Sequence, residues 1–199
     1  MQKEMTGNSI MKRRSAVALL LFSFPFHQGN AQQIVVPVQI QIPLLLKVIS
    51  LEKNISSRAV KYSIGIIFQQ SSQASREVKD ELIAMNGKKE SFLLNGTRVN
   101  FIPLEVESEK DIARILNSQR VDALYIPPLT SMNIKMLTEA TKSNRVLSVT
   151  GVPEYVERGV SVGIGIEGEK PEVIINVTAS KEEGVEFSSK VLKMARIVY

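Results

Sequence analysis

The sequence predicts an α/β protein: a single domain with a mostly parallel sheet of βαβ units, followed by a C-terminal β-hairpin and a packing helix. Apolar strand-like and amphipathic helix-like segments alternate about every 25 residues between positions 62 and 149, which is typical of βαβ units. The first strand-like segment, Tyr62–Phe68, has no polar face, which indicates a sheet covered on both sides. After Thr150 the alternation stops and two strands follow each other directly.

The segment ahead of the first strand, residues 32–61, is expected to hold an extended stretch, a short helix and a loop. Gln32–Pro43 alternates apolar and polar residues and contains two prolines, which favours an extended chain. Leu44–Ile49 is apolar enough for one or two buried helical turns. We expect Pro43 to start this helix, because proline suits the first helical position. The polar residues Glu52–Lys61 predict a loop.

Four strands and three helices are then predicted in alternation. Ser72 or Ser75 can cap the first helix, and Asn86-Gly87 can end it in the left-handed conformation that both residues tolerate. Ser108–Asp111 resembles a capping box and opens the second helix. The expected strands are 62–68, 98–104, 121–126 and 145–149, and the expected helices are 72–85, one that opens at 108, and 131–142.

The residues beyond 150 predict a hairpin and a final helix. Val160–Glu167 and Glu172–Val177 are expected strands joined by a glycine-containing turn, and Ser180–Glu183 is an expected short helical turn. Phe187–Val198 has apolar residues at helical spacing, which predicts a helix that packs on the sheet. The sequence shows no internal repeat and no low-complexity linker, so residues 62–199 are predicted to form one domain.

Residues 1–31 have the three-part layout of a secretory signal peptide. The basic run Met11–Arg14 precedes the apolar stretch Ala16–Phe26, and the small residues at positions 29 and 31 fit cleavage after Ala31. The apolar stretch is about half as long as a membrane-spanning helix. We therefore expect a periplasmic protein without a stable membrane anchor. Met11 is an alternative start of translation.

Loss of this leader changes what the composition allows. The pI of 9.4 suggests nucleic-acid binding, but more than half of the net charge of +5 belongs to the leader, so no nucleic-acid partner is expected. The chain has no cysteine, and its one histidine, His27, leaves with the leader. Without either residue type, the usual catalytic triads and thiolate or imidazole metal sites cannot form. We expect no catalytic residue, no metal, no cofactor and no enzymatic activity.

Residues Gly163–Gly168 match the glycine pattern GxGxxG of dinucleotide-binding proteins. The dinucleotide fingerprint of this form follows a strand and opens a helix, so that the helix N-terminus faces the pyrophosphate. Here the glycines fall within a predicted strand and its turn. A structural role in twist and turn formation is the preferred interpretation, and no nicotinamide cofactor is expected.

Polar and aromatic residues gather near the carboxyl ends of the predicted parallel strands, where open α/β sheets bind ligands. Tyrosine and arginine are also enriched at binding hot spots. The alternative interpretation is that these residues only form the turns of the loops. The candidate partner- or ligand-binding residues are Tyr125, Pro127, Thr150, Gly151, Tyr155, Arg158 and Gly159.

Three groups of segments carry structural rather than catalytic signatures. They are Leu44–Lys47; Val146–Gly151 with Tyr155 and Arg158–Val160; and Ile174–Asn176 with Phe187–Arg196. Together they resemble the YfiR-like (YfiR/HmsC-type) family of periplasmic proteins, and the resemblance extends over most of residues 37–199. It implies a small single-domain α/β protein made with a signal peptide.

The resemblance also implies regulation. A family member of this kind is expected to bind the periplasmic domain of an inner-membrane diguanylate cyclase, or of another sensor protein, and to lower cyclic-di-GMP output and biofilm formation. The chain departs from better-known members by lacking cysteine, so their disulfide-linked redox sensing cannot operate here. The family's double glycine is reduced to Gly159, after Arg158.

A second class of function stays open. The four βα units, with Val121–Pro127, also look like one lobe of a periplasmic solute-binding protein related to ABC transporter components. Such proteins close two lobes around a ligand, and this chain is long enough for one. A homodimer would supply a second wall, so a homodimer is also kept as an expectation.

Overall fold

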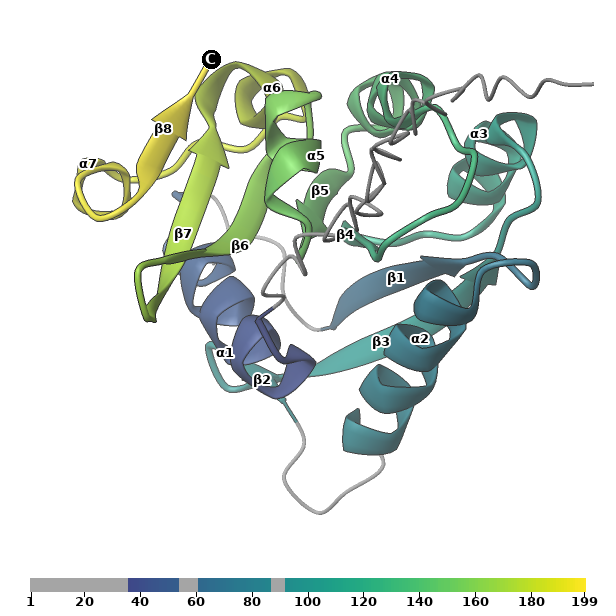
Figure 1. Ribbon diagram of the computed structural model, residues 1–199. Coiled ribbons are helices and arrows are strands. Elements are labelled where there is room, and N and C mark those ends of the chain that lie inside the picture. Colours follow the sequence, from purple (N-terminus) through teal and green to yellow (C-terminus); the bar gives the residue numbers. More distant parts are fainter. Residues whose placement is uncertain (1–35, 54–60, 87–91) are drawn as a thin grey trace, which may run out of the picture. The chain divides into compact units, whose positions relative to one another are not determined.

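One mixed sheet organises the residues that the structure, a computed structural model, describes: 36–53, 61–86 and 92–199. Its strands lie in the order β2-β3-β1-β4-β5-β6-β7-β8 (Figure 1). The strands are β1 (Tyr62–Phe68), β2 (Leu93–Leu94), β3 (Thr97–Glu105), β4 (Ala123–Ile126), β5 (Leu147–Thr150), β6 (Val162–Glu167), β7 (Lys170–Asn176) and β8 (Arg196–Val198). The helices are α1 (Val38–Ile49), α2 (Gln73–Asn86), α3 (Glu109–Ser118), α4 (Ile134–Asn144), α5 (Pro153–Glu157), α6 (Val177–Glu182) and α7 (Ser189–Leu192).

The strand directions confirm the predicted fold class. Strands β3, β1, β4, β5 and β6 run parallel to their neighbours in that order, and β6 and β7 form the expected antiparallel hairpin. Every residue of β1 is buried, as its lack of a polar face predicted. The expected signal peptide, residues 1–31, lies outside the described residues, as do parts of the expected entry segment and loop.

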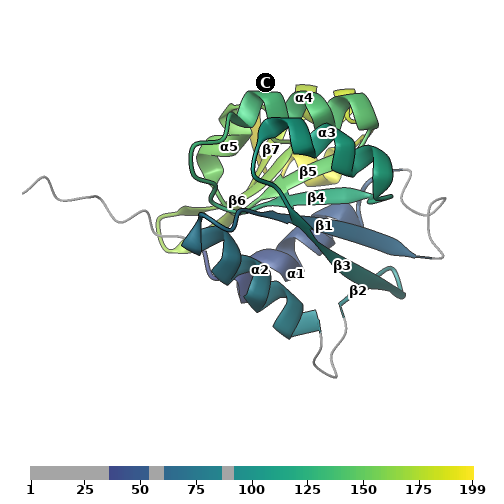
Figure 2. The same ribbon diagram turned by 90° about the vertical axis from the view of Figure 1, so that its right-hand side faces the viewer.

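Helices cover the sheet on both sides (Figure 2). Helices α1 and α2 lie on one face, where Ile42 and Leu82 join the core formed with Ile64 and Ile66 of β1. Helices α3 and α4 lie on the other face and contribute to a second core around Leu124. The capping box predicted at the start of α3 is present: the Ser108 backbone N–H donates to the Asp111 carboxylate over 3.1 Å. In the described residues, no helix is both long and apolar enough to cross a membrane.

The N-terminal helix is longer than predicted. Helix α1 begins at Val38, so Pro43 lies inside the helix and does not start it, and residues 38–43 of the expected extended stretch are helical. Proline inside a helix removes one backbone hydrogen bond, here to the Gln39 carbonyl. Both Gln39 and Pro43 are exposed, so water can bond to that carbonyl. Burial of the opposite apolar face of α1 stabilises the helix despite this loss.

The predicted final helix over Phe187–Val198 is wrong in its second half. Helix α7 ends at Leu192, and residues 196–198 form β8, which pairs in parallel with β7. The β-branched Ile197 and Val198 suit a strand, and their pairing with Ile175 and Asn176 satisfies backbone groups at the edge of β7. In a short apolar segment, periodicity alone does not distinguish a helix from a strand.

Two short elements, α5 and β2, were not predicted from the sequence. Helix α5 begins at Pro153, which takes an early helical position. Strand β2 pairs with β3 across the turn Asn95-Gly96, whose φ angles are 50° and 83°. Asparagine and glycine tolerate these left-handed angles, which a two-residue hairpin turn requires.

Candidate functional site

The carboxyl edge of the parallel strands contains the position where ligands bind in this class of sheet. The chain passes from β1 to β3 on one side and then returns to β4 on the other side of β1. In open α/β sheets the ligand-binding crevice lies at such a reversal, which here is the edge between the loops that follow β1 and β4. These loops hold Gln69–Ser72 and Pro127–Thr130, as the sequence predicted.

Hydrogen bonds cross this crevice and tie its two loops together. The Thr130 backbone N–H donates to Gln69 Oε1 over 2.8 Å, and the backbone N–H of Gln69 donates to Ser75 Oγ over 3.0 Å. Gln69 is 4% exposed, so its amide is enclosed between the loops. The polar groups of the crevice are therefore bonded to one another.

Helix α1 fills the neighbouring part of the same edge. Gln41 of α1 is 1% exposed; it accepts a hydrogen bond from the Tyr125 hydroxyl over 2.6 Å and donates from Nε2 to the Val36 carbonyl. Gly151 faces this amide so closely that a Cβ at position 151 would lie 2.0 Å from Gln41 Oε1. Burial raises the pKa of the Tyr125 phenol, with a further contribution from the Glu81 carboxylate, so the phenol stays a hydrogen-bond donor.

Four of the seven predicted site residues are thus placed inside the molecule: Tyr125, Pro127, Thr150 and Gly151. The Thr150 hydroxyl donates to the Ile126 carbonyl over 2.7 Å and accepts from the Val152 N–H over 3.0 Å. These contacts fix the end of β5. The structure gives Tyr125 and Gly151 a packing role against α1.

The other three predicted residues come together at the surface, beside α4. Tyr155 is half-buried, and its hydroxyl accepts a hydrogen bond from the Leu129 N–H over 3.1 Å. The exposed Arg158 guanidinium lies 5.9 Å from the centre of the Tyr155 ring, within cation–π range. Gly159 follows with a φ of 102°, a backbone conformation that favours glycine.

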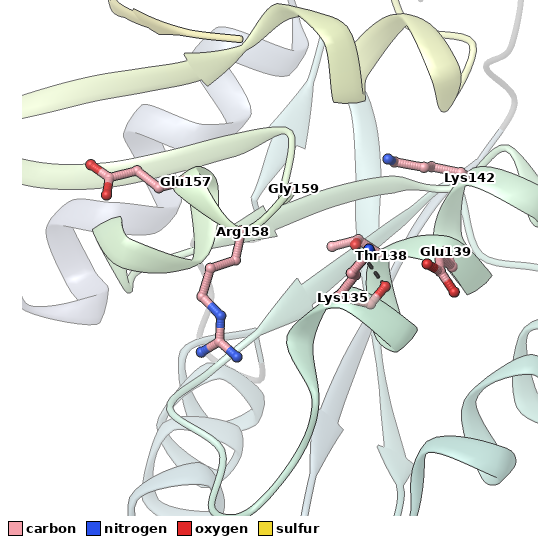
Figure 3. Close-up of a pocket in the computed structure, with 7 residues that line it drawn as sticks. All are labelled: Lys135, Thr138, Glu139, Lys142, Glu157, Arg158 and Gly159. Atoms are coloured by element: carbon pink, nitrogen blue, oxygen red, sulfur yellow. Dashed lines mark hydrogen bonds between the residues drawn. The ribbon is translucent and has the colours of Figure 1, made fainter.

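Arg158 and Gly159 line an open pocket of about 390 Å³ between α4 and the end of α5 (Figure 3). The other lining residues are Lys135, Thr138, Glu139, Lys142 and Glu157. The four residues from α4 are spaced to share one helical face. Sequence reasoning missed them: their spacing indicates a common face, but only the fold shows that this face meets the end of α5.

The charges of the pocket are partly paired. Lys142 forms an ion pair with Glu182 over 2.6 Å, and Glu157 forms one with Arg196 over 3.5 Å. Among the described residues, Lys135 and Arg158 have no carboxylate within ion-pair distance. The surface can thus bind a negatively charged group. Across the described ranges, no three acidic, histidine or cysteine side chains gather as metal ligands would.

This combination defines an α/β domain with one mixed sheet, a charged surface pocket beside α4 and buried polar residues at the carboxyl edge of the parallel strands. The family model described as YfiR/HmsC-like matches residues 71–196, and the chain belongs to this family. Membership supports a periplasmic regulator. No curated protein matches the chain.

Three solved structures share the fold. An ABC domain in complex with L-Trp from Streptococcus pneumoniae is 17% identical, with a TM-score of 0.59; the match covers 81% of this chain and 62% of that one. A conserved domain protein from Vibrio cholerae O1 biovar El Tor is 15% identical, with a TM-score of 0.60, and 84% and 61% are covered. A ligand-free, open substrate-binding protein with adhesive properties from Clostridium difficile is 17% identical, with a TM-score of 0.57, and 82% and 60% are covered. The chain thus spans about three fifths of each protein's length.

Proposed function

We propose that the chain is an exported, non-enzymatic regulator that binds the periplasmic domain of an inner-membrane diguanylate cyclase and modulates cyclic-di-GMP signalling and biofilm formation. The observation that carries the proposal is the YfiR/HmsC-like match over residues 71–196. Export would use residues 1–31, with cleavage after Ala31. The partner class comes from the family resemblance, and another periplasmic sensor domain is the alternative within it.

The arrangement of the candidate site supports action through a surface. Gln69 is enclosed between the loops that follow β1 and β4, and Gln41 fills the neighbouring part of the same edge. Tyr155, Arg158 and Gly159 remain accessible beside α4, and we propose that these residues belong to the partner-binding surface. Tyrosine and arginine there can supply the large, oriented contacts that dominate protein interfaces.

The proposal predicts a stable complex with a cyclase domain. The protein recovered from the periplasm should co-purify with the periplasmic domain of a diguanylate cyclase encoded in the same genome. Deletion of the protein should raise cellular cyclic-di-GMP and surface attachment, and N-terminal sequencing of the mature chain should begin at Gln32. Unchanged cyclic-di-GMP in the deletion strain, together with no complex for any cyclase domain of that genome, would contradict the proposal.

A periplasmic solute-binding role is the second candidate. It is favoured by the likeness to the three solved structures, two of which are described by their ligand or substrate binding. Such a ligand, at 100 times its dissociation constant, should stabilise the chain by about 2.7 kcal/mol. A thermal-shift screen of periplasmic metabolites measures this, and size-exclusion chromatography with light scattering tests the homodimer that a two-walled site would need. If no metabolite raises the melting temperature, the solute-binding role is contradicted.

A further inference from the structure

We propose that the pocket between α4 and the end of α5 is a docking site for a carboxylate side chain on an acidic segment of the partner protein, held between Arg158 and Lys135. This inference rests on the proposed regulatory function and adds the chemistry of the contact. Both cations line the same pocket and are exposed. Figure 3 shows them on two different elements, Lys135 on α4 and Arg158 at the end of α5.

The pocket carries positive charge that its own acids do not neutralise. The pocket is lined by three cations and two acids, but Lys142 and Glu157 are already paired with Glu182 and Arg196. Two cations that line the pocket, Lys135 and Arg158, therefore have no carboxylate of the described residues within ion-pair distance. The remaining acid, Glu139, lies on the side of Thr138 away from Arg158 (Figure 3). Lys135 and Arg158 together with Glu139 leave one net positive charge, which suits one carboxylate better than a doubly charged phosphate.

Tyr155 holds the Arg158 side chain in position. Its guanidinium lies over the Tyr155 ring, and that ring is held in turn by the hydrogen bond from the Leu129 N–H to its hydroxyl. An oriented guanidinium can bind a carboxylate through two parallel hydrogen bonds and loses less side-chain freedom on binding. Tyr155 is thus a positioning residue for Arg158.

Gly159 and Thr138 form one wall of the pocket. Gly159 has a φ of 102°, and a Cβ there would lie 3.1 Å from Thr138 Oγ1. The Thr138 hydroxyl donates to the Lys135 carbonyl over 2.9 Å. That wall is therefore bonded internally and offers no spare donor, so the guanidinium and the Lys135 ammonium supply the contacts to an incoming carboxylate.

The test uses charge reversal in the full-length protein processed in the periplasm. Arg158→Glu combined with Lys135→Glu should weaken binding to the cyclase periplasmic domain at least tenfold at 0.15 M salt and reduce its salt dependence. The control variant is Lys190→Glu, an exposed lysine on α7 outside the pocket; its affinity should be unchanged. Circular dichroism and thermal melting verify that all three proteins are folded.

A second measurement separates this site from the proposed function. A tetraglutamate peptide, titrated at low salt, should shift the amide NMR signals of Thr138 and Gly159 in the wild type but not in the double variant. If the cyclase domain binds both proteins equally and the peptide shifts nothing, the pocket proposal is wrong while the regulatory function stands. If the peptide binds at the pocket and no cyclase domain binds the wild type, the site stands and the proposed partner is wrong.

Discussion

Replacing Glu183 by alanine is expected to lower the free energy of unfolding by about 3–5 kcal/mol, because it leaves several buried donors without an acceptor. Glu183 is fully buried, and its carboxyl group joins elements that are far apart in the sequence. It lies 2.6 Å from Thr141 Oγ1 of α4, 2.7 Å from Ser148 Oγ and 2.8 Å from Ser148 N of β5, and it also bonds to Ser161 Oγ ahead of β6. Urea denaturation measures the loss.

Burial favours the protonated form of Glu183, and the hydrogen bonds around Thr141 suit that form. The Thr141 hydroxyl has a single hydrogen but two acceptors in reach, the Thr138 carbonyl at 2.9 Å and Glu183 Oε1 at 2.6 Å. If the acid carries a proton, it can donate to Thr141, and Thr141 can donate to Thr138, so both contacts are hydrogen bonds. Burial acts in the same direction, because it raises the pKa of Glu183.

A glutamine at position 183 is the matched control. It has one donor group and one acceptor, as the neutral acid does, so Glu183→Gln should cost less than about 1 kcal/mol while Glu183→Ala costs several. Both unfolding curves should keep the wild-type slope. Equal destabilisation by glutamine and alanine would mean that the fold requires the negative charge, contrary to the protonation inferred from Thr141.

The same protonation predicts how stability depends on pH. Below the ordinary glutamate pKa of 4.5, Glu183 is protonated in both the folded and the unfolded chain. Above it the unfolded chain releases this proton while the folded chain keeps it, so stability falls as the pH rises toward the raised folded-state pKa. The free energy of unfolding of the wild type minus that of Glu183→Gln should therefore decrease as the pH rises above 4.5. A difference that is constant or rises with pH would contradict this.

Local signals predicted those elements whose boundaries are set by nearby residues. Strand β1 falls on Tyr62–Phe68 as expected, and Ser108 and Asp111 form the predicted cap of α3. Strand β8 was missed because its pairing depends on the free edge of β7, which no local pattern reveals. The start of α1 was predicted wrongly at Pro43 for the same reason. A proline inside this helix is tolerated because α1 packs on a sheet whose strands are distant in the sequence.

The candidate site was likewise predicted only where local signals in the sequence were sufficient. The sequence predicted correctly that Tyr125 and Gly151 lie near the carboxyl ends of parallel strands, but this position is compatible with either a ligand site or a packed interior. The deciding residue is Gln41, which comes from a segment expected to be extended. Arg158 was found from residue type and loop position, whereas Lys135 required the packing of α4 beside α5.

Gly151→Ala is expected to destabilise the protein by about 2–4 kcal/mol, because the new methyl group must displace a bonded side chain. Its Cβ would lie 2.0 Å from Gln41 Oε1 and 2.4 Å from Gln41 Cδ. Gln41 cannot move without giving up its bonds to Tyr125 and to the Val36 carbonyl. The loss is measured by chemical denaturation, and α1 should then show faster amide hydrogen exchange than α4.

A double-mutant cycle with Gln41→Ala tests that cause. Gln41→Ala alone should cost about 1–3 kcal/mol, because the buried Tyr125 hydroxyl loses its acceptor. In the Gln41→Ala background the Gly151→Ala change no longer meets an amide, so its additional cost should fall below about 1 kcal/mol, a coupling of the size found for residues in contact. Additive costs would mean that Gly151 is required for another reason, such as the backbone at the end of β5. Strong coupling would mean that Gln41 of α1 is packed against Gly151 at the carboxyl end of β5, so that a solute could reach this part of the edge only after α1 has moved.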